Sequence, residues 1–235
     1  LDLSLGYDGL EQIISATGTQ WGTGEFKYDS LGNIRFKRLG GRRTTVSYNS
    51  KYQVSKSIDV GNLGGNTGTR GFNHDSRGNI TKAGNLSFNY DYADQPTRVS
   101  GDANGSYIYD GNLKRVKSVI NDRTRYNIYN LSGQLVHIYD LSKNEKTDYI
   151  KLGNMTIARV VNNQPTYLHF DALASPVGGT NSSGSVSFYE WYTPFGITLN
   201  NHSSNDNQAG FTGHIKDSDT GLVYMQARYY DPVIG

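Results

Sequence analysis

Aromatic and polar residues alternate along short stretches of this chain. In Phe26-Lys27-Tyr28 and in Phe88-Asn89-Tyr90 the rings fall at every second position, and a strand directs every second side chain to the same face. We therefore expect strands with one ring-lined face and one solvated face. Gly or Asn interrupts almost every window, and no pattern of period 3.6 persists over three turns, so helices are not expected.

A short motif recurs along the first part of the chain: an aromatic residue, then Asp or Asn, then a small turn and an aliphatic residue. The spacing is 21 residues from Tyr7 to Tyr28 and 20 from Tyr109 to Tyr129. A period near 20 fits two strands and two turns, so each repeat is expected to form one antiparallel hairpin. The Asp or Asn side chain should cap the turn, and the later Gly should supply a positive φ. The motif occurs at Tyr7-Asp8, Tyr28-Asp29, Tyr48-Asn49, His74-Asp75, Tyr90-Asp91, Tyr109-Asp110 and Tyr129-Asn130.

Three stretches depart from the repeat. The Gly-rich stretch Gly61–Gly71 and the polar stretch Asn200–Gly210 are typical of mobile connections. The stretch Phe211–Gly235 is the least repetitive part of the chain, and we interpret it as a terminator of the repeat array.

Composition narrows the possible functions. A chain of 235 residues can form one large all-β domain. With 28 Gly, 18 Tyr and only 35% hydrophobic residues, it must bury aromatic rings rather than Leu and Val. The formal charge of +2 comes from 23 basic and 21 acidic residues scattered singly, which does not indicate a nucleic-acid partner. The chain has no Cys, which excludes disulfides and thiolate metal sites.

The ends and the hydropathy of the chain give two further expectations. No apolar run is long enough for a membrane helix, so no membrane span is expected. The first residues, LDLSLGYDGL, lack a starting Met and the features of a signal peptide. We therefore expect a fragment of a longer chain.

Two groups of polar residues could carry chemistry. His169 and Asp171 lie two positions apart and would share a strand face, where they could ligate a metal or act as acid and base. Arg228 with Asp217, Asp219 and Asp231 could form a carboxylate cluster of the aspartyl-protease kind. We favour structural roles for both groups, because no third metal ligand lies nearby and Asp217–Gly221 is a good turn sequence. No catalytic residue, metal or cofactor is assigned.

The basic residues are expected to be of two kinds, some exposed to solvent on strands and one buried in an ion pair. The pairs Arg42-Arg43 and Lys114-Arg115 are expected at solvated strand positions. Arg228, in the terminator, is expected to be buried and paired with Asp231 or with an acidic residue of an earlier hairpin.

The repeats, the stretches Tyr167–Pro176 and Tyr192–Gly196, and the tail together resemble an Rhs/YD-repeat protein with its Rhs repeat-associated core domain. The tail is the specific part, and its core signature comprises Gly221, Tyr224, Ala227, Arg228, Tyr229, Tyr230, Asp231, Pro232 and Gly235. A second motif matches the family pattern Y-x-H-x-D-x-L-G-S-P through His169, Asp171, Ser175 and Pro176, with Ala174 in place of the Gly.

The resemblance implies an all-β fold in which spiralling antiparallel hairpins form a YD-repeat shell, or cage, that ends in an inward-turning core plug. It implies a shell segment over residues 1–165 and an Rhs repeat-associated core domain over 166–235. The residues of the plug motif and of the core signature would then be structural. Family self-cleavage uses acidic residues beyond the Asp-Pro-x-x-Gly, and these positions would lie after Gly235.

The resemblance also implies a function. The expected role is a non-enzymatic shell fragment of a bacterial polymorphic toxin that encloses a C-terminal toxic domain and is secreted or delivered out of the cell. Expected partners are that toxic cargo domain, upstream shell repeats and delivery machinery. The alternative is an extracellular adhesion or carbohydrate-binding module, because Tyr rings and Asn amides suit sugars. Burial of the repeat tyrosines distinguishes the two.

Overall fold

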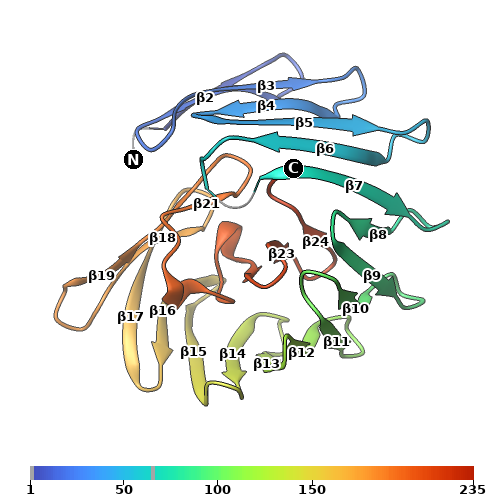
Figure 1. Cartoon of the computed structure of the whole chain (residues 1–235). Helices are drawn as coiled ribbons and strands as arrows, with labels where there is room; N and C mark the ends of the chain where they lie inside the picture. Colours follow the sequence, from blue (N-terminus) through green and yellow to red (C-terminus); the bar gives the residue numbers. More distant parts are fainter. Residues whose placement is uncertain (1–2, 65–66) are drawn as a thin grey trace. The chain divides into compact units, whose positions relative to one another are not determined.

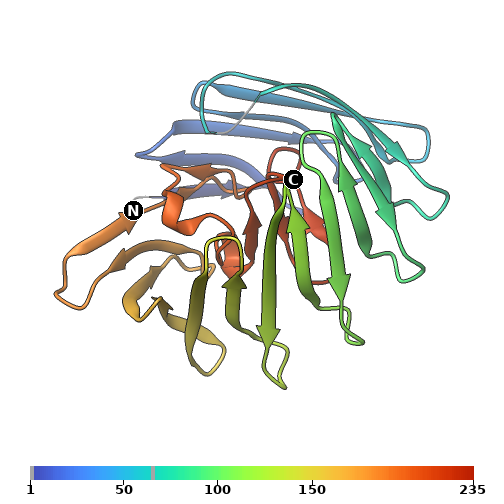
Figure 2. The ribbon, with the colours of Figure 1, turned by 60° about the horizontal axis from the view of Figure 1, so that its bottom comes forward.

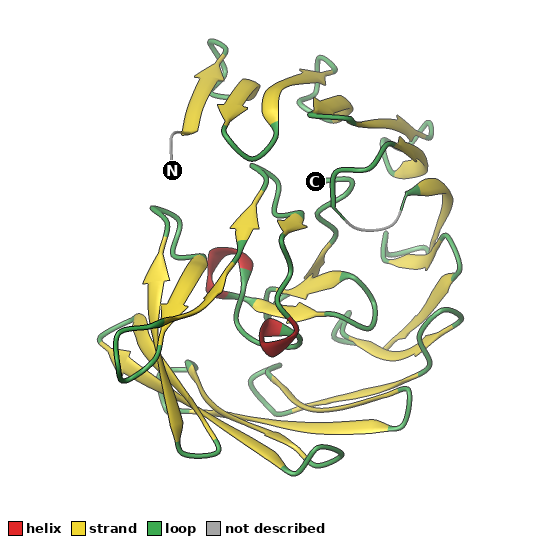
Figure 3. Ribbon diagram, turned by 60° about the vertical axis from the view of Figure 1, so that its left-hand side comes forward, coloured by secondary structure: helices red, strands yellow, loops and turns green. Residues whose placement is uncertain are grey.

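The computed structural model describes residues 3–64 and 67–235 of the chain. Antiparallel strands and tight turns make up almost all of the described chain, and the helical content is two short 3-10 helices, η1 (Ser203–Asn205) and η2 (Phe211–Gly213) (Figure 3). The predicted all-β fold is thus confirmed. No helix among the described residues is long and apolar enough to cross a membrane.

The chain divides into two compact units. Unit 1 comprises Leu1–Asn85, Trp191–Leu199 and Asp231–Gly235, and unit 2 comprises Leu86–Glu190 and Asn200–Tyr230. Each unit therefore combines a run of hairpins with segments from the C-terminal part of the chain.

In unit 1, consecutive strands pair antiparallel from β1 to β8. Two further short strands, which come from the C-terminal part of the chain, pair with each other as β20 (Trp191–Tyr192) and β21 (Thr198–Leu199). The eight consecutive strands are β1 (Leu3–Tyr7), β2 (Ile13–Gly18), β3 (Gly22–Tyr28), β4 (Ile34–Leu39), β5 (Arg42–Tyr48), β6 (Val54–Val60), β7 (Gly68–His74) and β8 (Ile80–Ala83).

In unit 2, consecutive strands again pair antiparallel, from β9 to β19, and tight turns join neighbouring strands (Figure 2). Residues 200–230, which we call the returning segment, contribute three more strands that pair in order: β22 (Ile215–Asp217), β23 (Leu222–Tyr224) and β24 (Tyr229–Tyr230). The consecutive strands are β9 (Leu86–Tyr90), β10 (Pro96–Ser100), β11 (Gly105–Tyr109), β12 (Arg115–Ile120), β13 (Arg123–Tyr129), β14 (Leu135–Asp140), β15 (Glu145–Leu152), β16 (Met155–Val161), β17 (Gln164–Phe170), β18 (Pro176–Thr180) and β19 (Val186–Tyr189).

The Asp or Asn of the repeat caps its turn, as predicted. In the first turn, Asp8 Oδ1 accepts hydrogen bonds of 2.9 Å from the backbone N–H groups of Leu10 and Gln12. The backbone closes the same loop through Asp8 N to Gln12 O at 3.0 Å. Each such turn satisfies its own polar groups and needs no help from the rest of the fold. The same bonds to positions two and four residues later occur at Asp29, Asn49, Asp75, Asp91, Asp110, Asn130, Asp171 and Asn181.

The residue three positions after each cap adopts a positive φ. Gly supplies it at Gly32 (83°) and Gly78 (94°), as predicted. Ala174 also adopts φ 63°, although it stands where the resembling family has Gly. A left-handed backbone is unfavourable by about 1 to 2 kcal/mol for a residue with a Cβ. Ala174 therefore holds a turn that Gly would form with less strain.

We predict that Ala174→Gly raises the free energy of unfolding by about 0.5 to 1 kcal/mol, because relief of the left-handed strain exceeds the added chain entropy of Gly. Gly184→Ala is the matched control in the next turn of this kind, with φ 81° and no atom within 4 Å of an added Cβ. In that variant the free energy of unfolding should fall by about 1 kcal/mol. Urea melts measure both, and a loss of stability in Ala174→Gly would contradict the prediction.

Four of the repeat tyrosines tie their hairpin to the preceding one. The hydroxyl of Tyr28 donates to the carbonyl of Ile13 at 2.9 Å, and that of Tyr48 donates to Ile34 at 3.0 Å. In unit 2, Tyr109 and Tyr129 donate in the same way to Pro96 and Arg115. These rings are half-buried and their polar ends are satisfied, so the repeat tyrosines serve the sheet itself.

We expect Tyr28→Phe to cost about 1 kcal/mol of unfolding free energy, because it leaves the partly buried carbonyl of Ile13 without its donor. Tyr92→Phe is the control, since Tyr92 is fully exposed at 102% at the tip of a turn. Chemical denaturation of the two variants should therefore differ. Equal midpoints would mean that the Tyr28 hydroxyl contributes nothing.

The apolar core of unit 1 lies between its hairpins and the segment 191–199. Trp21, Phe26 and Leu39 are buried with Leu199, and Trp191, Phe195 and Ile197 pack against them. The rings of Phe26 and Phe195 are 5.2 Å apart. The residue between the two rings of the first predicted pair, Lys27, is exposed, which confirms the predicted alternation at Phe26-Lys27-Tyr28.

The two stretches predicted as mobile loops differ from that prediction. The described part of Gly61–Gly71 includes the start of β7 at Gly68, while residues 65–66 lie outside the described residues. In Asn200–Gly210, helix η1 forms and Asn205, Asn207 and Gln208 are buried. Residues 200–204 are exposed, whereas the polar composition of residues 205–208 reflects buried hydrogen bonding.

Candidate functional site

The returning segment lies within the curve of strands β9–β17 of its own unit (Figure 1). Its strand β23 carries Val223 and Tyr224, which are 4% and 1% exposed. Its contacts with the surrounding hairpins are mainly pairs of buried polar and charged groups. These pairs form the candidate site, which attaches residues 200–230 to the hairpins of the same unit.

The first group of contacts centres on Arg115 of β12. The guanidinium donates to Asp217 Oδ2 at 2.8 Å and to the Tyr229 hydroxyl at 3.0 Å. The side chains of Arg115 and Asp217 are 4% and 3% exposed. The Tyr224 ring lies 4.4 Å from the guanidinium carbon, and its hydroxyl accepts from the backbone N–H of Arg115 at 2.7 Å. Ion pairing and cation–π contact thus combine at one buried cation.

The electrostatics of this group favour the charged form of Arg115. Burial works against its charge, but the hydroxyl oxygen of Tyr229 and the carboxylate of Asp217, which both accept from the guanidinium, outweigh burial and raise the pKa of Arg115. Burial, reinforced by Asp217, raises the pKa of the Tyr107 phenol, which donates to Asp217 at 3.4 Å. Tyr107 therefore stays neutral and acts as a hydrogen-bond donor.

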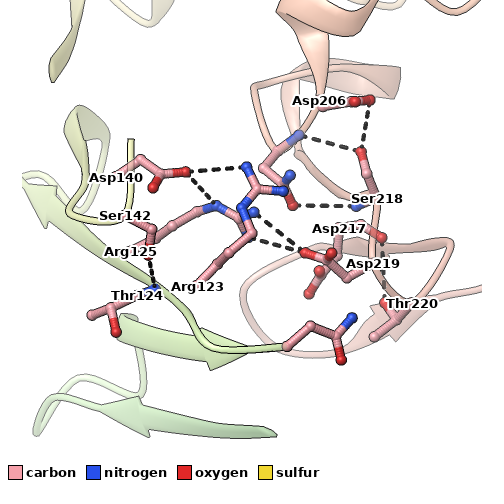
Figure 4. Close-up of polar contacts among 12 residues, drawn as sticks. Arg123, Thr124, Arg125, Asp140, Ser142, Asp206, Asp217, Ser218, Asp219 and Thr220 are labelled. Carbon is pink, nitrogen blue, oxygen red and sulfur yellow. Dashed lines mark hydrogen bonds and ion pairs between the residues drawn. The ribbon is translucent and has the colours of Figure 1, made fainter. Parts of the chain in front are cut away.

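A second group centres on Arg125 of β13 (Figure 4). Its Nε donates to Asp140 Oδ2 at 3.1 Å, and Nη1 donates to Asp219 Oδ2 at 3.2 Å. Arg125 is buried between the two carboxylates, one from the neighbouring strand β14 and one from the returning segment. The guanidinium fork thus joins a hairpin to the terminal part of the chain.

Polar residues of the 200–210 stretch complete the attachment of the returning segment. Asn205 accepts from Arg159 Nη2 and donates to Glu190 Oε2, both at 3.0 Å. The hydroxyl of Tyr149 donates to Gln208 Oε1. Burial raises the pKa of Tyr149 to about 12, so this phenol remains a donor at neutral pH. These bonds explain why a polar stretch is buried here.

Unit 1 holds its own terminal residues in a comparable way. Asp231 accepts from Arg70 Nη1 at 2.7 Å, and the Lys37 ammonium donates to the Pro232 carbonyl at 3.1 Å. Burial lowers the pKa of Lys37 to about 7, and the carboxylates of Asp231 and Asp59 offset only part of this effect. Asp59 is itself paired with the buried Arg42. The last residues of the chain are thus held by two cations of earlier hairpins.

Three expectations for basic residues are wrong. Arg228 is exposed, and Asp231 pairs instead with Arg70, an arginine of an earlier hairpin. Arg42 and Arg115, expected at solvated positions, are each 3% exposed. Arg43 is exposed, as predicted. The buried cations therefore come from the repeats and the carboxylates from the terminator, the reverse of the arrangement expected for Arg228.

The core-signature residues occupy different environments. Tyr224 and Pro232 are buried; Tyr229, Tyr230 and Asp231 are half-buried; and Gly221, Ala227, Arg228 and Gly235 are exposed. The structure brings Tyr224 and Tyr229 together at 5.3 Å between ring centroids. The carboxylates of Asp217, Asp219 and Asp231 bind three different arginines, so they do not form a carboxylate pair.

The plug-motif residues fall around one turn. Asp171 caps the turn through the N–H groups of Leu173 and Ser175, while His169 is exposed and contacts Thr180 Oγ1 at 3.1 Å. Pro176 and Ser175 are buried, and Ser175 Oγ accepts from Thr212 N of the returning segment at 3.0 Å. Across the described residues, no three His, Cys, Asp or Glu side chains are grouped as a metal site.

Sequence reasoning missed the buried cations Lys37, Arg42, Arg115, Arg125 and Arg159. For Arg42 one signal was present in the sequence. Val46 faces the buried side of β5, and Arg42, an even number of positions earlier, faces the same side. For Arg115 no such signal exists, since a β-bulge between Ile108 and Tyr109 shifts its register.

Repeated hairpins with capped turns, to which ion pairs attach the returning segment, define an all-β repeat protein. The family described as Teneurin YD-shell matches residues 2–235, and this chain belongs to it.

Relatives of this chain include a bacterial nuclease and an animal protein. The tRNA3(Ser)-specific nuclease WapA of Bacillus spizizenii is 24% identical over 96% of this chain and 10% of its own length. Teneurin-1 of Gallus gallus is 27% identical over 97% of this chain and 8% of its own length. This chain thus spans about a tenth of the length of these relatives, and their names describe much longer proteins.

Solved structures share the fold. The structure titled "Crystal Structure of TcdB2-TccC3-Cdc42" superposes with a TM-score of 0.64 at 16% identity, and the match covers 100% of this chain and 15% of the other. The structure titled "Crystal Structure of TcdB2-TccC3 without hypervariable C-terminal region" gives a TM-score of 0.63. The resemblance to Rhs/YD-repeat proteins is therefore confirmed.

Proposed function

We propose that this chain is the terminal part of a non-enzymatic shell that encloses a toxic domain located after it in the same protein. The observation that carries the proposal is the returning segment, whose Asp217 and Asp219 are bound by buried arginines of the hairpins. This arrangement suits a segment that must stay in place against the hairpins. The carboxylates and tyrosines of the site are engaged with one another, which fits a structural role better than a catalytic one.

The proposal includes an organisation and partners. Residues 1–165 would be the shell segment and residues 166–235 the core domain, whose signature residues terminate the repeats. The partners would be the toxic cargo domain, upstream repeats and a delivery machinery, and the protein would be secreted or delivered from a bacterial cell. The likeness to WapA and to the TccC3 structures supports this choice.

Protease protection tests the proposal in the complete protein that carries this segment. We expect the region after Gly235 to resist protease while the repeats are folded, and to become sensitive in the Arg115→Ala variant. Separate expression of that region should harm the producing cell, whereas the complete protein should not. Rapid digestion of the region in the folded protein would contradict an enclosing role.

A second candidate function, carbohydrate binding, is favoured by a groove on β11–β15. Lys117, Tyr126, Tyr139 and Lys146 face one another in register across four strands. The lysine Nζ atoms of Lys117 and Lys146 lie 5.4 and 6.0 Å from the ring centroids of Tyr126 and Tyr139. Aromatic rings beside ammonium groups suit an acidic sugar.

Titration with acidic and neutral oligosaccharides tests this second candidate. Binding should require an acidic sugar and weaken at least tenfold in Tyr126→Ala, while Tyr167→Ala, at a tyrosine 49% exposed on another strand, should bind normally. An equal loss in both variants, or no binding by the unmodified chain, would exclude the groove as a sugar site.

A further inference from the structure

An amine, a carboxamide and a buried carboxylate meet in unit 2. The Lys216 Nζ contacts Asn201 Oδ1, and it lies 3.7 Å from Glu190 Oε1. Glu190 is 1% exposed and the Lys216 side chain is 18% exposed, so the lysine reaches this carboxylate from a largely shielded position. These are the three groups that an amide-forming condensation between side chains requires.

Neighbouring bonds hold each of the three groups in place. The backbone N–H of Lys216 donates to Gln208 O at 2.9 Å. The Asn201 amide nitrogen donates to Asp206 Oδ1 at 3.3 Å, which leaves the carbonyl oxygen directed to Lys216. Glu190 Oε2 accepts from Asn205 Nδ2 at 3.0 Å. The amine is therefore presented to the carbonyl end of the carboxamide.

We propose that Lys216 and Asn201 become joined by an intramolecular amide bond, with Glu190 as the proton carrier. Glu190 takes a proton from the Lys216 ammonium, and the free amine attacks Cγ of Asn201. A C–N bond forms between Lys216 Nζ and Cγ, and the bond from Cγ to Nδ2 breaks. The two protons that the lysine nitrogen loses end on the departing nitrogen, which leaves as ammonium, and Glu190 returns to its carboxylate form.

The proximity of the groups and the burial of Glu190 favour this step, while Asn201 itself is exposed. Holding two reacting groups in contact removes most of the entropic barrier of a reaction between separate molecules. Burial of Glu190 disfavours its charged form, and transfer of the Lys216 proton to it removes both charges of the pair. The condensation needs no oxidant and no further reactant.

A second lysine of unit 2 provides an internal comparison. Lys114 Nζ contacts Gln226 Oε1, so an amine again meets a carboxamide. Among the described residues, however, no carboxylate forms an ion pair with Lys114. The proposal therefore assigns a covalent bond to Lys216 and Asn201, and only a hydrogen bond to Lys114 and Gln226.

Intact mass spectrometry of the 235-residue chain tests the bond directly. We expect a mass lower than that of the sequence by one ammonia molecule, and a tryptic peptide in which residues around Asn201 and Lys216 are branched together. A mass equal to that of the sequence would overturn the proposal. So would an ammonia loss that tandem sequencing places elsewhere.

Three variants test the roles. Lys216→Arg should restore the full mass because it removes the nucleophile, and Glu190→Gln should restore it while a carbonyl remains to accept from Asn205. Lys114→Arg is the matched control and should still lose one ammonia. Persistence of the branched peptide in Glu190→Gln would overturn the role of Glu190. These masses can be read whatever the stability of each variant.

Discussion

Replacing Arg115 with alanine should lower the free energy of unfolding of unit 2 by about 3 to 5 kcal/mol. The substitution leaves the carboxylate of Asp217, 2% exposed, without its cation. It also removes the contact between the guanidinium and the Tyr224 ring. An unpaired buried charge is much more costly than an unpaired surface charge, so the effect should be a large share of the stability of a typical domain.

Urea unfolding followed by circular dichroism measures this loss. Arg228→Ala is the matched control, because Arg228 lies on the same terminal segment but is exposed, and it should change the free energy by about 0.5 kcal/mol or less. Equal, small changes in both variants would mean that the returning segment is only loosely attached. A larger loss in Arg228→Ala would contradict the assignment of Arg115 as the buried cation.

The stability of unit 1 should rise with pH between about pH 7 and pH 9.5 because of Lys37. Its pKa is lowered to about 7 in the folded chain, whereas an unfolded lysine titrates near 10.4. Between these values the unfolded chain binds more protons than the folded chain, so raising the pH favours folding, by at most about 1.4 kcal/mol per pH unit. Below about pH 7 both states hold the proton, and this dependence disappears.

Tryptophan fluorescence can follow this effect, because Trp21 and Trp191, the two tryptophans of the chain, both belong to unit 1. Denaturation followed by this fluorescence should show that the free energy of unfolding rises with pH in the unmodified chain. This slope should be absent in Lys37→Met. Lys56→Met, which removes an exposed lysine of β6, should retain the slope. If Lys37→Met keeps the slope, another group titrates and Lys37 is not its source.

The turns and the alternation of the strands could be predicted from the sequence because each depends on residues only a few positions apart. The cap at Asp29 and the positive φ at Gly32 lie within four residues of each other, and both follow from known turn chemistry. The alternation Phe26-Lys27-Tyr28 likewise predicted its buried and exposed faces. The resemblance to Rhs/YD-repeat proteins added what local patterns cannot give, the expectation that the tail turns inward as a plug.

The candidate site was harder to predict because each repeat contains a β-bulge beside its turn. The register shifts between Lys27 and Tyr28, between Ser47 and Tyr48 and between Ile108 and Tyr109, and each shift reverses the face that the following residues occupy. In β4 this places Lys37 inside and leaves Phe36 half-exposed. Partners such as Arg115 and Asp217, 102 positions apart, leave no trace in a local pattern.

In unit 2 the buried arginines come earlier in the sequence than the carboxylates of the returning segment, and this order has a consequence for synthesis of the chain. Arg115 and Arg125 of unit 2 emerge from the ribosome before Asp217 and Asp219, which follow them by 102 and 94 positions. Until those carboxylates arrive, Arg115 and Arg125 lack their terminal counterions, and hydrating them is more favourable than burying them. The nascent hairpins thus remain open to water on this face until the returning segment has been made, and its carboxylates then allow these arginines to be buried.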